Sequence, residues 1–163
     1  HENVIFLGPP GVGKTHLAVA LAIKVCSHGF KVYFTTMHTL IAKLKETQSK
    51  GKAYLSASLV IVDEAGYLPV DSREAYLFFQ FISYRYEKSS TILTSNKSFA
   101  EWGEVLGDAV IAAAILDRLL HHSHVLSIRG ESYRLKEKRQ AGLFGTGQPV
   151  TVLVHTQQTE TTT

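Results

Sequence analysis

The chain has 163 residues, of which 45% are hydrophobic and 19% are charged. These values are sufficient for one domain with its own core, and they exclude intrinsic disorder for most of the chain. No apolar run approaches the roughly 20 residues that a membrane-spanning helix needs. The single cysteine, Cys26, excludes an internal disulfide and a multi-cysteine zinc site. It is typical of a reducing compartment, so we expect a cytoplasmic protein. The net charge of +3 permits nucleic-acid binding without showing it.

Apolar strands alternate with amphipathic helices along the chain. In chain order, the sequence predicts a strand at Val4–Leu7, a helix at Lys14–Ser27, a strand at Lys31–Thr35, a helix at Thr39–Thr47, a strand at Leu59–Val62, a helix at Arg73–Tyr86, a strand at Thr91–Thr94, a helix at Ala109–Leu120 and a strand at His124–Ile128. Such alternation indicates an α/β fold with a central parallel sheet flanked by helices. Ligands of such folds bind at the carboxyl ends of the strands.

A glycine-rich loop joins the first predicted strand to the first predicted helix. Its sequence, GPPGVGKT, matches the phosphate-binding pattern G-x-x-x-x-G-K-[ST] in the required strand–helix context. Glycines let successive backbone N–H groups point at phosphate oxygens, and the positive end of the helix faces the same anion. Lys14 is suited to contact the β and γ phosphates of ATP, and the Thr15 hydroxyl to ligate Mg²⁺. The candidate nucleotide-binding residues are Gly8, Pro9, Pro10, Gly11, Val12, Gly13, Lys14, Thr15 and His16.

Polar residues follow two further predicted strands. Asp63 and Glu64 come where LVIV leaves the sheet, and Ala65 and Gly66 then let the chain turn. Asp63 is suited to hold Mg²⁺ through water, and Glu64 to polarise an attacking water as general base. Asn96, after the strand TILT, is suited to orient that water or to sense the γ-phosphate. The alternatives are a solvated acidic turn for the carboxylates and a turn-forming asparagine for Asn96.

GPPGVGKT, LVIVDE and TILTSN together resemble the AAA+ family of P-loop ATPases. More specifically, the run from Asn3 to about Leu143 resembles the IstB-like ATP-binding helper proteins of IS21-type insertion sequences, which are similar to DnaC helicase loaders. Three blocks carry this resemblance: YLSASLVIVDEAGYLP at Tyr54–Pro69, TSNKSFAEWGEVLGD at Thr94–Asp108, and AAILDRLLHHSHVLSIRGESYRLKEKR at Ala113–Arg139.

The resemblance implies an oligomeric, Mg-dependent ATPase that binds DNA and recruits or regulates a transposase. It also implies a further region before the first strand, which we expect this chain to lack together with the adenine-binding residues of that region. We expect residues 1–143 to form the ATPase core and residues 144–163 to form a mostly disordered tail. The alternative function is a helicase-loader adaptor that uses ATP as a switch and binds a replicative helicase. A small-molecule kinase is a weaker alternative, because Asp63 and Glu64 favour water as the acceptor.

By resemblance, Arg118 lies where AAA+ proteins place an arginine finger, a cation that a neighbouring subunit supplies to the γ-phosphate. Arg129 and Arg134 are rival candidates for that role or for nucleotide sensing. An exposed arginine paired with a nearby aspartate is the structural alternative for Arg118.

Four lysines follow the third predicted element, where the family has a DNA-facing insertion. Lys43, Lys45, Lys50 and Lys52 would bind DNA phosphates without sequence preference. A solvated helix and loop is an equally good interpretation. His121, His122 and His124 are interpreted as ordinary helix-end histidines, because the sequence shows no second cluster that would complete a metal site.

Overall fold

The computed structural model of the chain describes residues 1–46, 50–135 and 151–156. Its strands are β1 (Asn3–Leu7), β2 (Val32–Thr36), β3 (Leu59–Ala65), β4 (Ser90–Ser95), β5 (Ser123–Arg129) and β6 (Thr151–Thr156). Its helices are α1 (Lys14–Cys26), α2 (Met37–Lys45), α3 (Lys50–Ser56), α4 (Ser72–Arg85), α5 (Trp102–Val105) and α6 (Ala109–Leu120), with short 3₁₀ turns at Phe99–Glu101 and Tyr133–Leu135.

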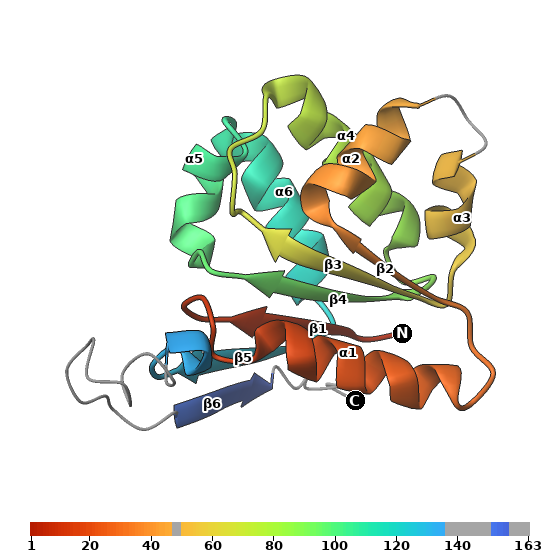
Figure 1. Cartoon of the computed structure of the whole chain (residues 1–163). Coiled ribbons are helices and arrows are strands. Elements are labelled where there is room, and N and C mark those ends of the chain that lie inside the picture. The colour runs from red at the N-terminus through yellow and green to blue at the C-terminus, as the bar shows by residue number, and fades with distance from the viewer. Residues whose placement is uncertain (47–49, 136–150, 157–163) are drawn as a thin grey trace, which may run out of the picture.

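The six strands form one sheet in the order β2-β3-β4-β1-β5-β6. The first five named in this order are parallel to their neighbours, whereas β6 runs antiparallel to β5. The predicted parallel α/β fold is therefore confirmed, and the strand β6 extends the sheet at one edge (Figure 1). β6 lies within the expected tail, and residues 144–150 and 157–163 of that tail lie outside the described residues.

Helices cover the two faces of the sheet unequally. α1 packs on one face, whereas α2, α4, α5 and α6 gather on the other (Figure 1). The larger core lies on that second face and includes the buried side chains of Phe78, Phe81, Trp102 and Ile115. The smaller core, under α1, includes Phe6, Ala18 and Ile61. Both faces of the central strands are thus buried, which is why their sequences are continuous apolar runs.

Side-chain caps set several helix starts. Asp71 and Glu74 form a capping box at the start of α4, with Asp71 accepting from the Glu74 amide at 2.8 Å and Glu74 from the Asp71 amide at 3.0 Å. Thr36 accepts from the Thr39 amide at 3.2 Å, so α2 begins at Met37 and not at the predicted Thr39. The sequence prediction missed α3 and α5, which are short.

A buried arginine joins α3, α4 and β4. Arg85 is 1% exposed, and its guanidinium donates to the carbonyls of Tyr54 (2.8 Å), Ala57 (2.9 Å) and Ser90 (2.6 Å). Burial lowers the pKa of Arg85 to about 10. The guanidinium thus satisfies carbonyl groups at the end of α3 that no intrahelical amide can reach.

Within the described part of the chain, no helix is both long and apolar enough to span a bilayer.

Candidate functional site

The glycine-rich loop lies at the carboxyl end of β1. β1 ends at Leu7, α1 begins at Lys14, and the loop between them turns back over the sheet (Figure 1). Gly11 and Gly13 have φ values of 84° and 97°, in the left-handed region that favours glycine. At Gly8, a Cβ atom would lie 2.1 Å from the Ile128 carbonyl oxygen, so β5 also requires glycine there.

The first turn of α1 opens onto this loop without a side-chain cap. Gly13 is the N-cap residue, and no side chain of the described structure caps the helix. The first turn also contains no acidic residue. Its backbone N–H groups are therefore left for an external acceptor, and the helix dipole makes an anion the preferred one.

Lys14 provides the cation of this loop. Its Nζ atom donates to the carbonyls of Gly8 at 2.7 Å and Pro9 at 2.8 Å, so the ammonium is held inside the loop. The pKa of Lys14 lies below its ordinary value, chiefly because the side chain is partly buried. The negative charge of Asp63 opposes this shift, and the positive charge of Arg134 adds to it. An entering anion would relieve the cost of the buried charge.

Thr15 and Asp63 meet beside the loop. The Thr15 hydroxyl donates to the two Asp63 carboxylate oxygens, which lie at 3.1 and 3.2 Å. Asp63 is 6% exposed and belongs to β3, next to β4 in the sheet. A hydroxyl and a carboxylate at this separation are the hard oxygen ligands that Mg²⁺ prefers, so this pair fits that ion.

Thr94 connects the two acidic residues, and the sequence analysis did not single it out. Its hydroxyl donates to Asp63 Oδ1 and accepts from the Glu64 amide at 3.1 Å. The β3–β4 register shifts between Val62 and Ala65, so the side chain of Thr94 replaces a ladder partner for Glu64. Thr94 is 1% exposed. A buried threonine in an apolar strand beside an acidic strand end was the available signal.

Glu64 itself changes the direction of the backbone. Its φ is 57°, which is uncommon for a residue other than glycine. The strand β3 runs to Ala65, and the chain then turns at Ala65 and Gly66 as the sequence suggested. Gly66 has a φ of 81°, and the Tyr67 amide donates to the Glu64 carbonyl at 3.2 Å, so Glu64 and Gly66 together reorient the chain. Asp63 is consequently buried against Thr94, whereas Glu64 is exposed to solvent.

Asn96 follows β4 at the same edge of the sheet. Its Oδ1 atom is buried and accepts no hydrogen bond from the described residues. An orphaned buried amide oxygen is costly, so this position favours an interaction with a group from outside the chain.

The segment after β5 lies against the loop. The Tyr133 amide donates to the Gly11 carbonyl at 2.9 Å, and a Cβ atom on Gly11 would lie 3.1 Å from the Cα of Ser132. Arg134 is near enough to Lys14 to lower its pKa. Arg134 therefore belongs to the surroundings of the loop in its own chain.

Arg118 lies at the opposite edge of the sheet. Asn3, which begins β1, donates to the Leu119 carbonyl at 3.1 Å, so the end of α6 adjoins the amino ends of the strands. The strand β1 runs from this edge to the loop, and its first and last Cα atoms, in Asn3 and Leu7, are about 13 Å apart at about 3.3 Å per residue. The Arg118 guanidinium lies 4.9 Å from the centre of the Phe79 ring and donates to the Ala114 carbonyl at 2.9 Å. Arg118 cannot reach the loop of its own chain.

Two of the candidate DNA-binding lysines form ion pairs. Lys43 lies 3.3 Å from Glu46, and Lys45 lies 2.7 Å from Glu74. The side chains of Lys50 and Lys52, in α3, lie outside the described residues.

Comparison with known proteins gives the family. The family model described as IstB-like ATP binding protein matches residues 1–141. This chain belongs to the IstB-like ATP-binding protein family. It is 57% identical over 149 residues to a protein of Pseudomonas aeruginosa named as a putative ATP-binding protein of insertion sequence IS21. The aligned region covers 88% of this chain and 56% of that protein. It is 50% identical over 144 residues to the corresponding IS5376 protein of Geobacillus stearothermophilus, with coverages of 85% and 57%. The chain thus spans a little over half the length of these relatives.

Solved structures give the same fold. The crystal structure of the DnaC helicase loader superposes with a TM-score of 0.61 at 31% identity, covering 72% of this chain and 75% of that one. DnaA from Aquifex aeolicus, solved with AMPPCP bound, superposes with a TM-score of 0.65 at 21% identity, covering 86% of this chain and 46% of that one. The IstB-like chain therefore has the AAA+ type of P-loop fold.

Proposed function

We propose that this IstB-like chain binds and hydrolyses ATP with Mg²⁺, as the ATPase core of a DNA-binding helper protein in insertion-sequence transposition. The observation that carries the proposal is the contact of the Thr15 hydroxyl with the Asp63 carboxylate beside an uncapped helix start. It supports the proposal because a hydroxyl and a carboxylate that fit Mg²⁺ lie beside backbone N–H groups and an ammonium suited to phosphate. The name of the family and of its curated members supports ATP as the nucleotide.

In the proposed reaction, each residue acts on one part of the triphosphate. The N–H groups of the loop and Lys14 neutralise the phosphate oxygens. Thr15 and Asp63 would hold Mg²⁺, which when bound screens the charge that develops on the phosphates. Glu64, exposed beside the site, accepts a proton from the attacking water, and the orphaned Asn96 oxygen orients that water.

Arg118 serves a neighbouring subunit in this proposal. It lies across the sheet from its own loop, so it reaches a γ-phosphate only where another subunit places that phosphate at the end of α6. The proposed active form is therefore a homo-oligomer, in which a finger of this kind typically contributes about 10³-fold or more to the rate. Mixing Arg118→Ala chains with Lys14→Ala chains tests this arrangement, because mixed oligomers contain intact sites and regain activity.

Lys14→Ala and Glu64→Gln separate binding from hydrolysis. Lys14→Ala is expected to abolish ATP binding in a fluorescent-nucleotide titration. Glu64→Gln is expected to bind ATP normally but to release no phosphate, because an amide cannot accept the proton of water. Equal phosphate release by Glu64→Gln and the unaltered chain would remove Glu64 from the role of general base.

DNA and a transposase are the proposed partners. The names of the insertion-sequence relatives support this context. If Lys43, Lys45, Lys50 and Lys52 contact DNA phosphates, their joint replacement by glutamine will weaken duplex DNA binding and flatten its dependence on salt. Unchanged salt dependence of binding would place the DNA contacts elsewhere.

The likeness to the DnaC helicase loader favours a second candidate, a helicase-loading adaptor. In that case ATP acts as a switch for holding a replicative helicase. Binding assays of the ATP-loaded, full-length protein with purified transposase and with purified replicative helicase distinguish the two candidates, because each predicts a different partner.

A further inference from the structure

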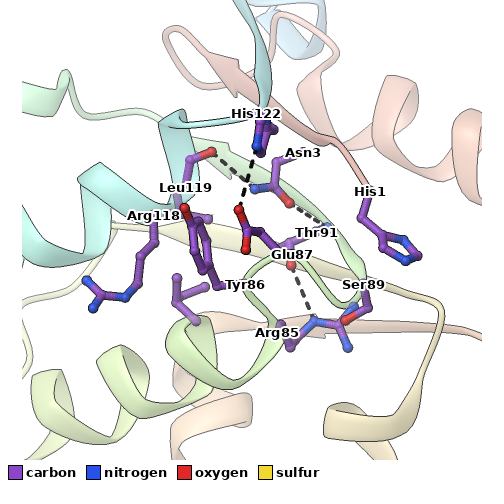
Figure 2. Close-up of a pocket in the computed structure, with 11 residues that line it drawn as sticks. His1, Asn3, Arg85, Tyr86, Glu87, Ser89, Thr91, Arg118, Leu119 and His122 are labelled. Atoms are coloured by element: carbon purple, nitrogen blue, oxygen red, sulfur yellow. Dashed lines mark hydrogen bonds and ion pairs between the residues drawn. The ribbon is translucent and has the colours of Figure 1, made fainter. Parts of the chain in front are cut away.

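A cluster of potential metal ligands lies at the amino ends of the strands, opposite the glycine-rich loop at their carboxyl ends. His121 and His122 follow the end of α6, and Glu87 lies in the connection from α4 to β4. One ligand atom from each of the three residues lies within 4.8 Å of the other two. Glu87 Oε1 is 4.0 Å from His121 Nδ1 and 3.9 Å from His122 Nε2. Figure 2 shows Glu87 and His122 facing one another across a pocket at this edge.

We propose that Glu87, His121 and His122 bind a first-row divalent transition-metal ion, with Zn²⁺ as the reference ion. Two imidazoles and one carboxylate form a ligand set that Zn²⁺ and its neighbours favour, whereas Mg²⁺ favours oxygen ligands alone. Three protein ligands leave a fourth position for water. The site lies apart from the ATP and Mg²⁺ site proposed for the same chain, and its metal binding does not depend on that function.

The distances are close to those of a bound site. Metal–ligand bonds of about 2.1 Å place the ligand atoms of a tetrahedral site about 3.4 Å apart. The distances from Glu87 to the two histidines, 3.9 and 4.0 Å, are thus about 0.5 Å too long, and the separation of the two histidine ligand atoms is within 4.8 Å. The three side chains are between 39% and 56% exposed, so small rotations can close this gap without repacking the core.

The backbone on both sides of the cluster is held in place. The amides of Lys88 and Ser89 donate to the Arg85 carbonyl at 3.0 and 3.1 Å, which fixes the turn that carries Glu87. The side chain of Asn3 holds the Leu119 carbonyl near the end of α6. The two elements that supply the ligands are therefore already positioned relative to one another, which lowers the cost of binding.

Nearby groups are compatible with a cation. The guanidinium of Arg118 is directed away from Glu87 (Figure 2), because it contacts the Phe79 ring and the Ala114 carbonyl. His121 Nδ1 is 2.7 Å from the Tyr86 hydroxyl, a hydrogen bond that a metal at Nδ1 would replace. With neutral imidazoles, the three ligands carry one negative charge, which favours a dication.

Zn²⁺ titration tests the proposal without nucleotide. All chains in this test carry the substitution Cys26→Ser, because Cys26 is exposed in the unaltered chain and its thiolate would compete for zinc. Competition with a chromophoric chelator measures the affinity, and the visible spectrum of the Co²⁺ form reports the ligands. We expect one Zn²⁺ per chain. His121→Ala, His122→Ala and Glu87→Gln should each weaken the affinity about ten-fold or more, since even a lost outer-shell partner commonly costs about 10- to 100-fold.

His124→Ala is the matched control. His124 is 38% exposed and lies 3.1 Å from Glu2, so it is an equally accessible histidine beside a carboxylate at the same edge. Its replacement should leave the zinc affinity unchanged. His1→Ala serves as a second control, because His1 also lines the pocket. Circular dichroism of each metal-free variant verifies that it folds.

Two results would overturn the proposal. One is that the His121→Ala and His122→Ala variants bind zinc as tightly as the Cys26→Ser parent does. The other is the absence of binding to the folded parent at about 0.1 mM free Zn²⁺. In the second case the three side chains form only a surface ion pair when the histidines are protonated.

Discussion

Replacing Thr94 by valine tests how β3 and β4 hold the two acidic residues. Valine keeps the branched shape but removes the hydroxyl that donates to Asp63 and accepts from the Glu64 amide. The buried bond to the charged Asp63 is worth about 1.5–3 kcal/mol, and the orphaned, partly buried Glu64 amide costs about 1 kcal/mol. Asp63 keeps its bond from Thr15, and the new methyl group contributes about 0.8 kcal/mol. We expect a net loss of about 2 kcal/mol in the free energy of unfolding, a magnitude typical of broken buried hydrogen-bond networks.

Urea unfolding of the nucleotide-free chain, followed by circular dichroism, measures this change. Thr94→Ser should recover most of the stability, because serine restores the hydroxyl. Thr35→Val is the matched control: Thr35 is 4% exposed on the neighbouring edge strand β2, and its hydroxyl donates only weakly, at 3.2 Å, to the adjacent Thr36 carbonyl. It should cost less than about 1 kcal/mol. Equal stability of Thr94→Val and Thr35→Val would refute the bridging role of Thr94.

Three further predictions concern the loop and the buried arginine. Gly11→Ala should speed amide exchange around Ser132 more than Gly13→Ala does. Both glycines have positive φ, but only a Cβ atom at position 11 would contact Ser132, at 3.1 Å from the Ser132 Cα atom. Arg85→Met should lower the free energy of unfolding by about 3 kcal/mol in a urea titration, because three buried or partly buried carbonyls lose their donor. As the pH rises, nucleotide affinity should begin to fall before the pH reaches the ordinary lysine pKa of about 10.4. The reason is that the pKa of Lys14 is lowered, so its ammonium loses its proton at a lower pH than an ordinary lysine does. Lys14→Arg, which stays charged, should show no such fall in a fluorescent-nucleotide titration.

The succession of apolar runs was sufficient to predict the fold class, because strands buried on both faces consist mainly of apolar residues. GPPGVGKT also fixed the position of the loop, since its spacing leaves few other backbone paths between a strand and a helix. Short helices such as α3 escaped prediction, because seven residues give too little periodicity and tertiary packing decides them.

The amino-acid order by itself determined which residues end each strand. Asp63, Glu64 and Asn96 stand directly after or at the ends of apolar runs, and parallel strands bring such ends to one edge. Tertiary structure alone decided which of these residues touch. The hydroxyl of Thr94 meets Asp63 because β4 pairs with β3 in a particular register, with a shift between Val62 and Ala65. Likewise, Glu87 meets His121 and His122 only because α4 and α6 pack side by side, and no local pattern encodes a contact between segments so distant in sequence.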